Sequence, residues 1–216
     1  MSYQIKEIFY TLQGEGAQAG RAAVFCRFAG CNLWSGRESD RAAAGCRFCD
    51  TDFVGADGEN GGRYRSAVRL AQRIESCWPT DLEAPRHASR RFVVLTGGEP
   101  LLQVDAALLD ALHARGFEVA VETNGTRHVP AGVDWVCVSP KAGAGWVQLS
   151  GDELKVVWPQ KGLELEDLER GEFQHRFLQP MDGAARAESL KACVAACLAR
   201  PLWRLSLQTH KLAGLK

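Results

Sequence analysis

The sequence predicts an α/β fold whose central sheet is parallel and either open or partly closed as a barrel. Runs rich in β-branched and aromatic residues alternate with helical patterns along the chain. Short segments containing Gly or Pro separate these runs, as in strand–helix–strand units. The chain has 216 residues, whereas a complete eight-fold barrel typically takes about 250. We therefore expect an abbreviated barrel.

Two strands and a helix are expected in the first third of the chain. YQIKEIFY (3–10) and AAVFCRF (22–28) are rich in residues that favour strands. A helical pattern covers 66–77, where Ser66 is a suitable N-cap. GADGENGG (55–62) is expected to be a flexible surface loop.

The rest of the chain continues the alternation. RFVVL (91–95) is typical of a buried strand, and the helix expected at 104–115 would end at Gly116. The later elements are strands at 117–123, 134–139, 153–158 and 175–180, an alanine-rich helix at 184–199 and a last strand at 202–208. The chain has no internal repeat, so we expect a single domain, 1–216.

Composition and charge exclude several classes of protein. Lys and Arg together number 26 and Asp and Glu 26, which gives a formal net charge of +0. A balanced charge argues against nucleic-acid binding and against attraction to an anionic membrane. The first residues do not form a basic region followed by an apolar run, and no apolar stretch is as long as a membrane span. We expect a cytoplasmic protein with reduced thiols.

Polar or glycine-rich segments follow five of the predicted strands. They are the loop of Cys31 after 22–28, TGGEP after 91–95, ETNGT after 117–121, SPK after 134–138 and QPMD after 175–178. The carboxyl ends of parallel strands meet at one edge of a sheet, where α/β enzymes place their active sites. The sequence therefore predicts an active site at this edge.

Three cysteines, Cys31, Cys46 and Cys49, lie in a polar loop where packing does not explain them. A structural zinc site usually has four protein ligands, and this loop contains no histidine to complete a set. Three thiolates can instead hold an iron–sulfur cluster and leave one iron open, and the C-x2-C step favours this interpretation over zinc. The other cysteines lie inside predicted strands or helices and are expected in the core: Cys26, Cys77, Cys137, Cys193 and Cys197.

Motifs spread over the chain resemble the radical S-adenosylmethionine (SAM) superfamily. CRFCDT, in which Phe48 precedes Cys49, and TGGEP after the next strand carry the resemblance. The superfamily's usual motif is C-x3-C-x2-C, whereas an insert of fourteen residues, 32–45, separates the first two cysteines here. Together with LQGEG, FCRFAGCNLW and LQTHK, this expansion resembles the 7-carboxy-7-deazaguanine synthase family of the queuosine pathway.

The resemblance implies an abbreviated, partly open (β/α) radical SAM barrel with a parallel core sheet. It also implies a [4Fe–4S] cluster on Cys31, Cys46 and Cys49 with SAM on the open iron, so the adenosyl radical is the reactive species and no side chain is catalytic. In TGGEP, Gly97 and Gly98 allow close backbone approach and Glu99 can pair with the methionine ammonium, although a tight strand-to-helix turn would use the same residues. The implied SAM contacts are Phe48, Cys49, Asp50, Gly98, Glu99, Glu122, Asn124, Ser139, Pro140, Lys141, Gln179, Pro180, Met181 and Asp182.

By the same resemblance, the substrate is 6-carboxy-5,6,7,8-tetrahydropterin, converted to 7-carboxy-7-deazaguanine and ammonia. Arg27 can hold a carboxylate bidentately, and because it lies in an apolar strand its charge requires a partner. The implied substrate contacts are Leu12, Gln13, Gly14, Glu15, Arg27, Thr96, His210 and Lys216.

The resemblance further implies Mg²⁺, an electron donor such as flavodoxin, and a homodimer. Thr51 is expected to bind Mg²⁺ together with substrate oxygens, the alternative being an Asx or ST turn in DTD. Two other functions stay open. One is a radical SAM activase that makes a glycyl radical on a partner protein. The other is a three-cysteine zinc or redox module, which would be colourless.

Overall fold

The computed structural model describes residues 2–79 and 91–216, which form an open nine-stranded sheet. The order of the strands is β3-β1-β2-β4-β5-β6-β7-β8-β9. Every pair from β2 to β9 is parallel, whereas β1 is antiparallel to both β2 and β3. The strands are β1 (Tyr3–Leu12), β2 (Ala22–Phe28), β3 (Gly62–Tyr64), β4 (Arg91–Gly97), β5 (Phe117–Thr123), β6 (Trp135–Val138), β7 (Ser150–Trp158), β8 (Glu172–Pro180) and β9 (Arg204–Leu205).

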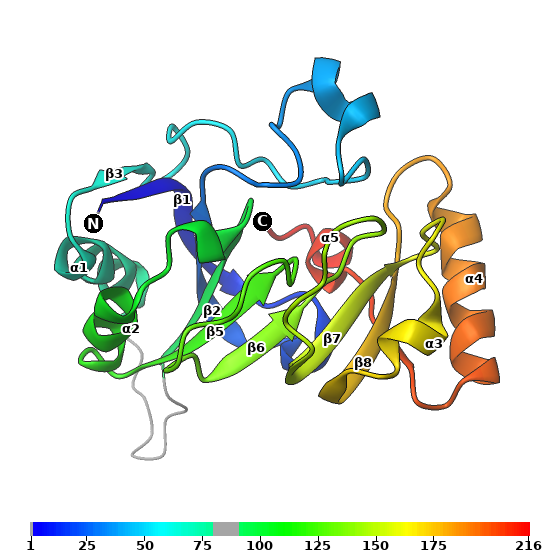
Figure 1. Cartoon of the computed structure of the whole chain (residues 1–216). Helices are drawn as coiled ribbons and strands as arrows, with labels where there is room; N and C mark the ends of the chain where they lie inside the picture. The colour runs from blue at the N-terminus through cyan, green and yellow to red at the C-terminus, as the bar shows by residue number, and fades with distance from the viewer. Residues whose placement is uncertain (1, 80–90) are drawn as a thin grey trace.

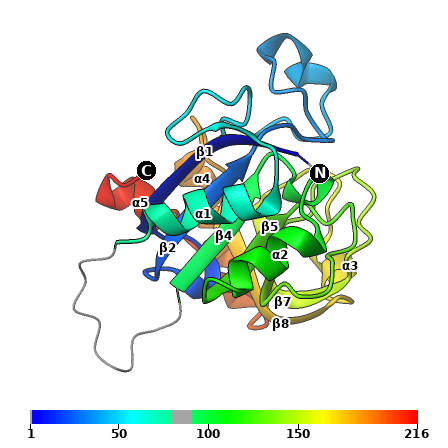
Figure 2. The ribbon, with the colours of Figure 1, turned by 90° about the vertical axis from the view of Figure 1, so that its left-hand side faces the viewer.

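Helices cover one face of this sheet. Figure 1 shows α1 and α2 at one end of the molecule and α3 and α4 at the other, and Figure 2 views the α1–α2 end directly. The α-helices are α1 (Ala67–Cys77), α2 (Ala106–His113), α3 (Leu165–Leu168), α4 (Arg186–Ala199) and α5 (Thr209–Ala213). Three 3-10 segments complete the chain: η1 (Gly16–Gln18), η2 (Glu38–Ala43) and η3 (Pro100–Leu102).

Successive side chains along each strand point to opposite faces of the sheet. One face is covered by helices, and the other lines a cavity. On β2, Val24, Cys26 and Phe28 are fully buried in the core shared with α1 and α2. Phe25 and Arg27 point to the opposite face and line the cavity. The same alternation on the other central strands places polar side chains on the cavity face.

Most predicted elements are confirmed, with shifted ends. Ser66 caps α1 as expected, accepting a hydrogen bond from the Arg69 amide at 3.3 Å. The helix expected at 104–115 is shorter, because Asp105 caps α2 and η3 forms separately before it. Within the described residues, β3, α3 and α5 are elements that the sequence pattern did not predict.

The strand expected at 202–208 is wrong over most of its length. Only Arg204–Leu205 pairs with β8. The chain then turns away from the sheet, since the Thr209 amide donates to the Gly14 carbonyl at 2.9 Å and α5 begins there. This turn brings the C-terminal segment over the cavity. In the part of the chain that the structure describes, no helix is both long and apolar enough to cross a membrane.

Candidate active site

A cavity opens at the carboxyl ends of the parallel strands, where the sequence predicts the active site. Most of the predicted site residues line it: Leu12, Gln13, Gly14, Glu15, Arg27, Cys31, Cys46, Phe48, Cys49, Asp50, Thr51, Thr96, Gly98, Glu122, Asn124, Ser139, Lys141, Gln179, Pro180, Asp182, His210 and Lys216. These residues come from both ends of the chain and from six strands or the loops that follow them. The fold therefore brings the motifs together.

Three predicted SAM contacts, Glu99, Pro140 and Met181, do not line the cavity. Glu99 is fully buried behind it. Its carboxylate accepts hydrogen bonds from the Thr123 hydroxyl and the Asn124 amide at 2.8 Å each. Burial raises the pKa of Glu99. This side chain therefore holds the segment after β5 in place from behind.

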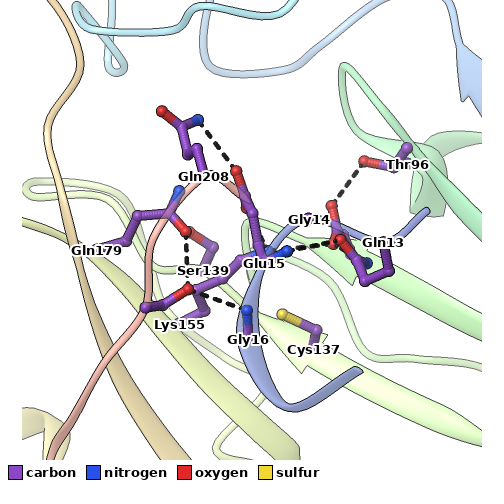
Figure 3. Close-up of polar contacts among 12 residues, drawn as sticks. Gln13, Gly14, Glu15, Gly16, Thr96, Cys137, Ser139, Lys155, Gln179 and Gln208 are labelled. Atoms are coloured by element: carbon purple, nitrogen blue, oxygen red, sulfur yellow. Dashed lines mark hydrogen bonds and ion pairs between the residues drawn. The ribbon is translucent and has the colours of Figure 1, made fainter. Parts of the chain in front are cut away.

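The floor of the cavity is an ion-pair network around Lys155. The Lys155 ammonium lies 2.7 Å from Glu15 Oε2 and 3.1 Å from Glu122 Oε1. Glu122 also accepts hydrogen bonds from Gln13 Nε2 and Thr96 Oγ1, each at 3.1 Å. Figure 3 shows Gln13 and Glu15, from the segment after β1, together with Thr96 of β4 and Lys155 of β7. We call Glu15, Glu122 and Lys155 the floor triad.

Register explains how the floor triad forms. Glu122 on β5 and Glu153 on β7 both pair with Cys137 of the intervening β6. The small Cys137 side chain lies between them on the cavity face, and Lys155 follows Glu153 by two residues, so it points to the same face. A long side chain on β7 can therefore reach the carboxylate on β5 across β6.

The charges in the floor triad stabilise one another. Burial alone would raise the pKa of Glu15, but the nearby Lys155 ammonium outweighs it and lowers this pKa to about 2. Burial alone would lower the pKa of Lys155, but Glu122 and Glu15 raise it well above its usual value. Glu15 and Lys155 are therefore both ionised at neutral pH.

Positive charge faces another side of the cavity. Arg27 Nη1 lies 3.0 Å from Glu7 Oε1, and the Lys216 ammonium lies 2.6 Å from Glu7 Oε2. Arg27 thus has the charged partner that its position in an apolar strand requires. His210 also lines the cavity, and burial lowers its pKa.

The loop between β2 and β3 carries the three predicted cluster ligands. Cys31, Cys46 and Cys49 are free thiols that face the cavity. Hydrogen bonding between Cys46 and Cys49 lowers the pKa of Cys46 to about 7 and raises that of Cys49. Burial raises the pKa of Cys31, and the proximity of Cys49 adds to this. We call residues 29–53 the cysteine loop.

The fourteen-residue insert folds on itself within the cysteine loop. The amides of Gly45 and Cys46 donate to the Leu33 carbonyl at 2.9 and 3.4 Å, which closes its base. Trp34 packs edge-on against Phe53 with ring centroids 5.6 Å apart. Figure 1 shows η2, at the tip of the insert, standing above the sheet. The insert therefore brings Cys46 back beside Cys31.

The C-terminal segment ties two sides of the cavity together. Gln208 Nε2 donates to Glu15 Oε1 at 3.0 Å and to Asp50 Oδ2 at 3.1 Å. The Lys211 ammonium lies 2.6 Å from both Asp50 Oδ2 and Asp182 Oδ2. The pKa of Asp50 is lowered, because these hydrogen bonds outweigh the opposing effect of burial.

Several residues that line the cavity were not predicted from the sequence. They are Phe25, Leu33, Trp34, Phe53, Thr123, Lys155, Val157, Gln208 and Lys211. For Lys155 a signal existed, because a lysine inside ELKVVW, a run expected to be buried, requires charged partners. Gln208 and Lys211 lie in LQTHK, but there the sequence singled out only the histidine.

Comparison with known proteins decides the family. A 7-carboxy-7-deazaguanine synthase from Bordetella pertussis is 60% identical over 215 residues, which cover 100% of both chains. The chain belongs to the 7-carboxy-7-deazaguanine synthase family. The enzyme of that name from Caulobacter vibrioides is also 60% identical over the full length of both chains. No protein-family model matches the chain.

A solved structure supports the same assignment. QueE from Escherichia coli matches with a TM-score of 0.69 and 28% sequence identity, covering 96% of this chain and 94% of that one. The open α/β sheet of this chain is therefore that of a QueE-type radical SAM enzyme, which confirms the predicted fold class. The three-cysteine zinc or redox module is excluded as the family assignment.

Membership of the 7-carboxy-7-deazaguanine synthase family implies a [4Fe–4S] cluster and SAM, and the cavity fits both. Each thiolate of such a cluster binds its own iron, and three free thiols share this cavity. A side chain at Gly98 would collide with the Gly30 carbonyl and approach the Cys31 β-carbon to 3.1 Å, so glycine keeps the cysteine loop close to β4. Within the described residues, no three His, Cys, Asp or Glu side chains are arranged around a single metal ion.

Proposed function

We propose that the protein is a 7-carboxy-7-deazaguanine synthase, which converts 6-carboxy-5,6,7,8-tetrahydropterin to 7-carboxy-7-deazaguanine and ammonia. Family membership supports the reaction class. The observation that carries the assignment of the substrate is the polarity of the cavity, where the floor triad and Arg27 face the same space as the three thiols. A ligand with N–H donors on one edge and a carboxylate on another matches these two sides.

The substrate would bind between the floor triad and the positive side of the cavity. The guanidinium of Arg27, already oriented by Glu7, would hold the carboxylate. Glu15 and Gln13 would accept and donate hydrogen bonds along the pterin edge. The Leu12 and Gly14 backbone, Thr96, His210 and the C-terminal Lys216 would complete the enclosure.

When bound, the cluster and SAM supply a radical that takes a hydrogen atom from the substrate. Cys31, Cys46 and Cys49 would hold the cluster. The other residues that we assign to SAM line the cavity or lie next to it: Phe48, Asp50, Gly98, Glu99, Asn124, Ser139, Pro140, Lys141, Gln179, Pro180, Met181 and Asp182. Glu122, which the resemblance gives as a SAM contact, we assign instead to the substrate as part of the floor triad. Burial lowers the pKa of Lys141, whose ammonium donates to Ser139 Oγ at 2.7 Å. The protein's part is to orient the reactants and exclude water.

Thr51 is our candidate for a Mg²⁺ ligand. It lines the cavity next to Cys49, and no hydrogen bond of its hydroxyl occurs among the residues that the structure describes. The turn in DTD is made instead by Asp52, whose carboxylate accepts from the Val54 amide at 3.1 Å. Mg²⁺ usually keeps several waters and few protein ligands, so one hydroxyl together with substrate oxygens is a suitable set.

We further infer a cytoplasmic homodimer that takes electrons from a flavodoxin-like donor. These properties rest on the family resemblance. The activase alternative differs from the synthase in one measurable respect, because it would consume SAM in proportion to product.

The test is anaerobic turnover by the reconstituted enzyme with 6-carboxy-5,6,7,8-tetrahydropterin, SAM and a reductant. We expect 7-carboxy-7-deazaguanine and ammonia to accumulate far beyond the SAM consumed, and the rate to rise when Mg²⁺ is added to metal-stripped enzyme. No product from this substrate, with the cluster intact, would overturn the proposed function. Unchanged turnover across the Mg²⁺ titration would overturn the role of Thr51 alone.

A further inference from the structure

We propose that Lys155 is a positioning residue that fixes Glu15 and Glu122 as a pair of ionised hydrogen-bond acceptors for the N–H donors of the substrate ring. This inference rests on the proposed function and extends it to a residue that the motifs do not include. Lys155 is 5% exposed, and its ammonium contacts both carboxylates directly.

The two carboxylates keep free acceptor capacity toward the cavity. An ionised carboxylate has about four lone-pair sites. Glu15 accepts from Lys155 and Gln208, and Glu122 accepts from Lys155, Gln13 and Thr96. Both side chains line the cavity and are only 15% and 21% exposed. The protein contacts do not occupy all the acceptor sites of either carboxylate, so each can accept a further hydrogen bond from a ligand.

The positive charge of Lys155, in contact with both carboxylates, favours the ionised form of Glu15. Two carboxylates near each other without a counterion favour uptake of a proton by one of them. A protonated carboxyl group donates a hydrogen bond, so it would oppose an N–H donor of the substrate. The low pKa of Glu15, about 2, agrees with a site kept free of that proton.

In the described part of the chain, no second cation forms an ion pair with both carboxylates, although His210 also helps to lower the pKa of Glu15. The charged or titratable groups that act on it are Glu15 from the segment after β1, Glu122 from β5, Cys137 from β6 and Glu153 from β7. Lys141 is near enough for the two ammonium groups to interact, but its own ammonium donates to Ser139. Among the described residues, Lys155 alone forms an ion pair with Glu15 and Glu122.

A structural role for Lys155 makes a different prediction from a positioning role. If the lysine only stabilised the fold, its loss would lower stability and leave ligand affinity unchanged in folded protein. If it fixes the acceptors, affinity must fall in protein that is still folded. The affinity must also recover in part when Glu122, left without its counterion, is replaced by a neutral side chain.

The experiment compares Lys155→Met, Lys155→Met with Glu122→Gln, and the matched exposed control Lys161→Met. Direct binding of 7-carboxy-7-deazaguanine is measured by calorimetry, KM and kcat by turnover, and folding by circular dichroism. For Lys155→Met we expect Kd and KM to rise by about tenfold or more, equivalent to about 1.4 kcal/mol, with a smaller change in kcat. The double variant should bind the product more tightly than the single variant, and the Lys161→Met control should match wild type.

Equal affinity of folded Lys155→Met and wild type would overturn the inference. If the single variant does not fold, the double variant decides between the two roles. Glu122→Gln is then measured beside it. A double variant that binds the product more weakly than Glu122→Gln would support the inference, because Lys155 still orients Glu15 in Glu122→Gln, and equal affinity would overturn it. Wild-type protein that neither binds the product nor turns over the pterin would instead overturn the proposed function, and this inference with it.

Discussion

The floor triad and the cysteine loop line the same cavity but are built differently. The floor triad stands on strands and on the segment after β1, and each of its charges is balanced by another side chain within 3.1 Å. The cysteine loop contains only one short 3-10 segment, and its three thiols are free. The protein thus completes the floor with its own side chains, whereas the thiols need a bound group to be fully coordinated.

The two regions should therefore differ in how far their geometry depends on bound cofactors. The floor triad should keep its geometry without cofactors, because its contacts are made by the chain. The cysteine loop should gain order and stability when the cluster binds, because metal binding adds to the free energy of the folded state.

Loss of one thiol should abolish turnover and leave the sheet intact. In Cys49→Ser we expect no SAM-dependent product and a loss of bound iron after anaerobic reconstitution. Circular dichroism of the metal-free protein should match metal-free wild type. Cys197→Ser on α4 is the control and should retain turnover, because Cys197 lies outside the cavity. A Cys49→Ser enzyme with full iron content and normal turnover would show that the cysteine loop does not depend on that ligand.

Removing the Glu99 carboxylate should give the largest loss of stability. Glu99→Leu leaves the Leu101 amide, the Thr123 hydroxyl and the Asn124 amide without their acceptor. Each buried unsatisfied donor costs about 1–3 kcal/mol, so we expect the free energy of unfolding to fall by about 3 kcal/mol or more. Urea denaturation of the metal-free protein measures it. A loss below about 1 kcal/mol would mean that Glu99 is not a buried support of the segment after β5.

A methyl group at Gly98 should disturb both regions where they meet. Its β-carbon would collide with the Gly30 carbonyl and press on Cys31, so Gly98→Ala should lower the free energy of unfolding by about 1–3 kcal/mol and reduce iron uptake. Gly145→Ala is the matched control, because nothing lies within 4 Å of a β-carbon there. Thermal unfolding and iron assay of both variants test the contrast. Equal thermal stability and equal iron uptake in the two variants would contradict the close packing of the cysteine loop on β4.

The floor triad predicts a pH window for stability. The pKa of Glu15 falls from 4.5 to about 2 on folding, so its ion pair contributes fully above pH 4.5 and is lost as the pH falls toward 2. The difference in unfolding free energy between wild type and Glu15→Gln should be constant above pH 4.5 and shrink below it. Urea denaturation between pH 3 and 7 measures this difference. A difference that does not change with pH would contradict the ionised floor.

The smallest effect is expected at Lys211, which joins the C-terminal segment to the cysteine loop. The Lys211 side chain is 32% exposed, and ion pairs of this kind contribute about 0.2–1 kcal/mol. Lys211→Met should reduce stability within that range and weaken SAM binding slightly, since Asp50 and Asp182 lose their common partner. Arg170→Met, at a more exposed pair with Asp167, is the control and should change neither. If Lys211→Met binds SAM as tightly as wild type, Lys211 has no role in SAM binding.

The sequence predicts the features that depend on local pattern. The N-cap at Ser66, the parallel strands and the placement of polar motifs at one edge all follow from periodicity and capping chemistry. The contacts of Lys155 with Glu15 and Glu122 could not be predicted, because they depend on β6 lying between β5 and β7. The contact of Gln208 with Glu15 joins residues 193 positions apart, and the turn that makes it replaces the strand expected at 202–208. Contacts of this range depend on tertiary packing, which local propensity does not determine.

The role of Cys31, Cys46 and Cys49 is tested by anaerobic reconstitution with iron and sulfide, followed by electron paramagnetic resonance of the reduced protein with and without SAM. We expect a [4Fe–4S]⁺ signal that shifts when SAM is added, because three thiolates would leave one iron free for it. No cluster, or a signal indifferent to SAM, would contradict the assignment of the three cysteines and of the cavity they share.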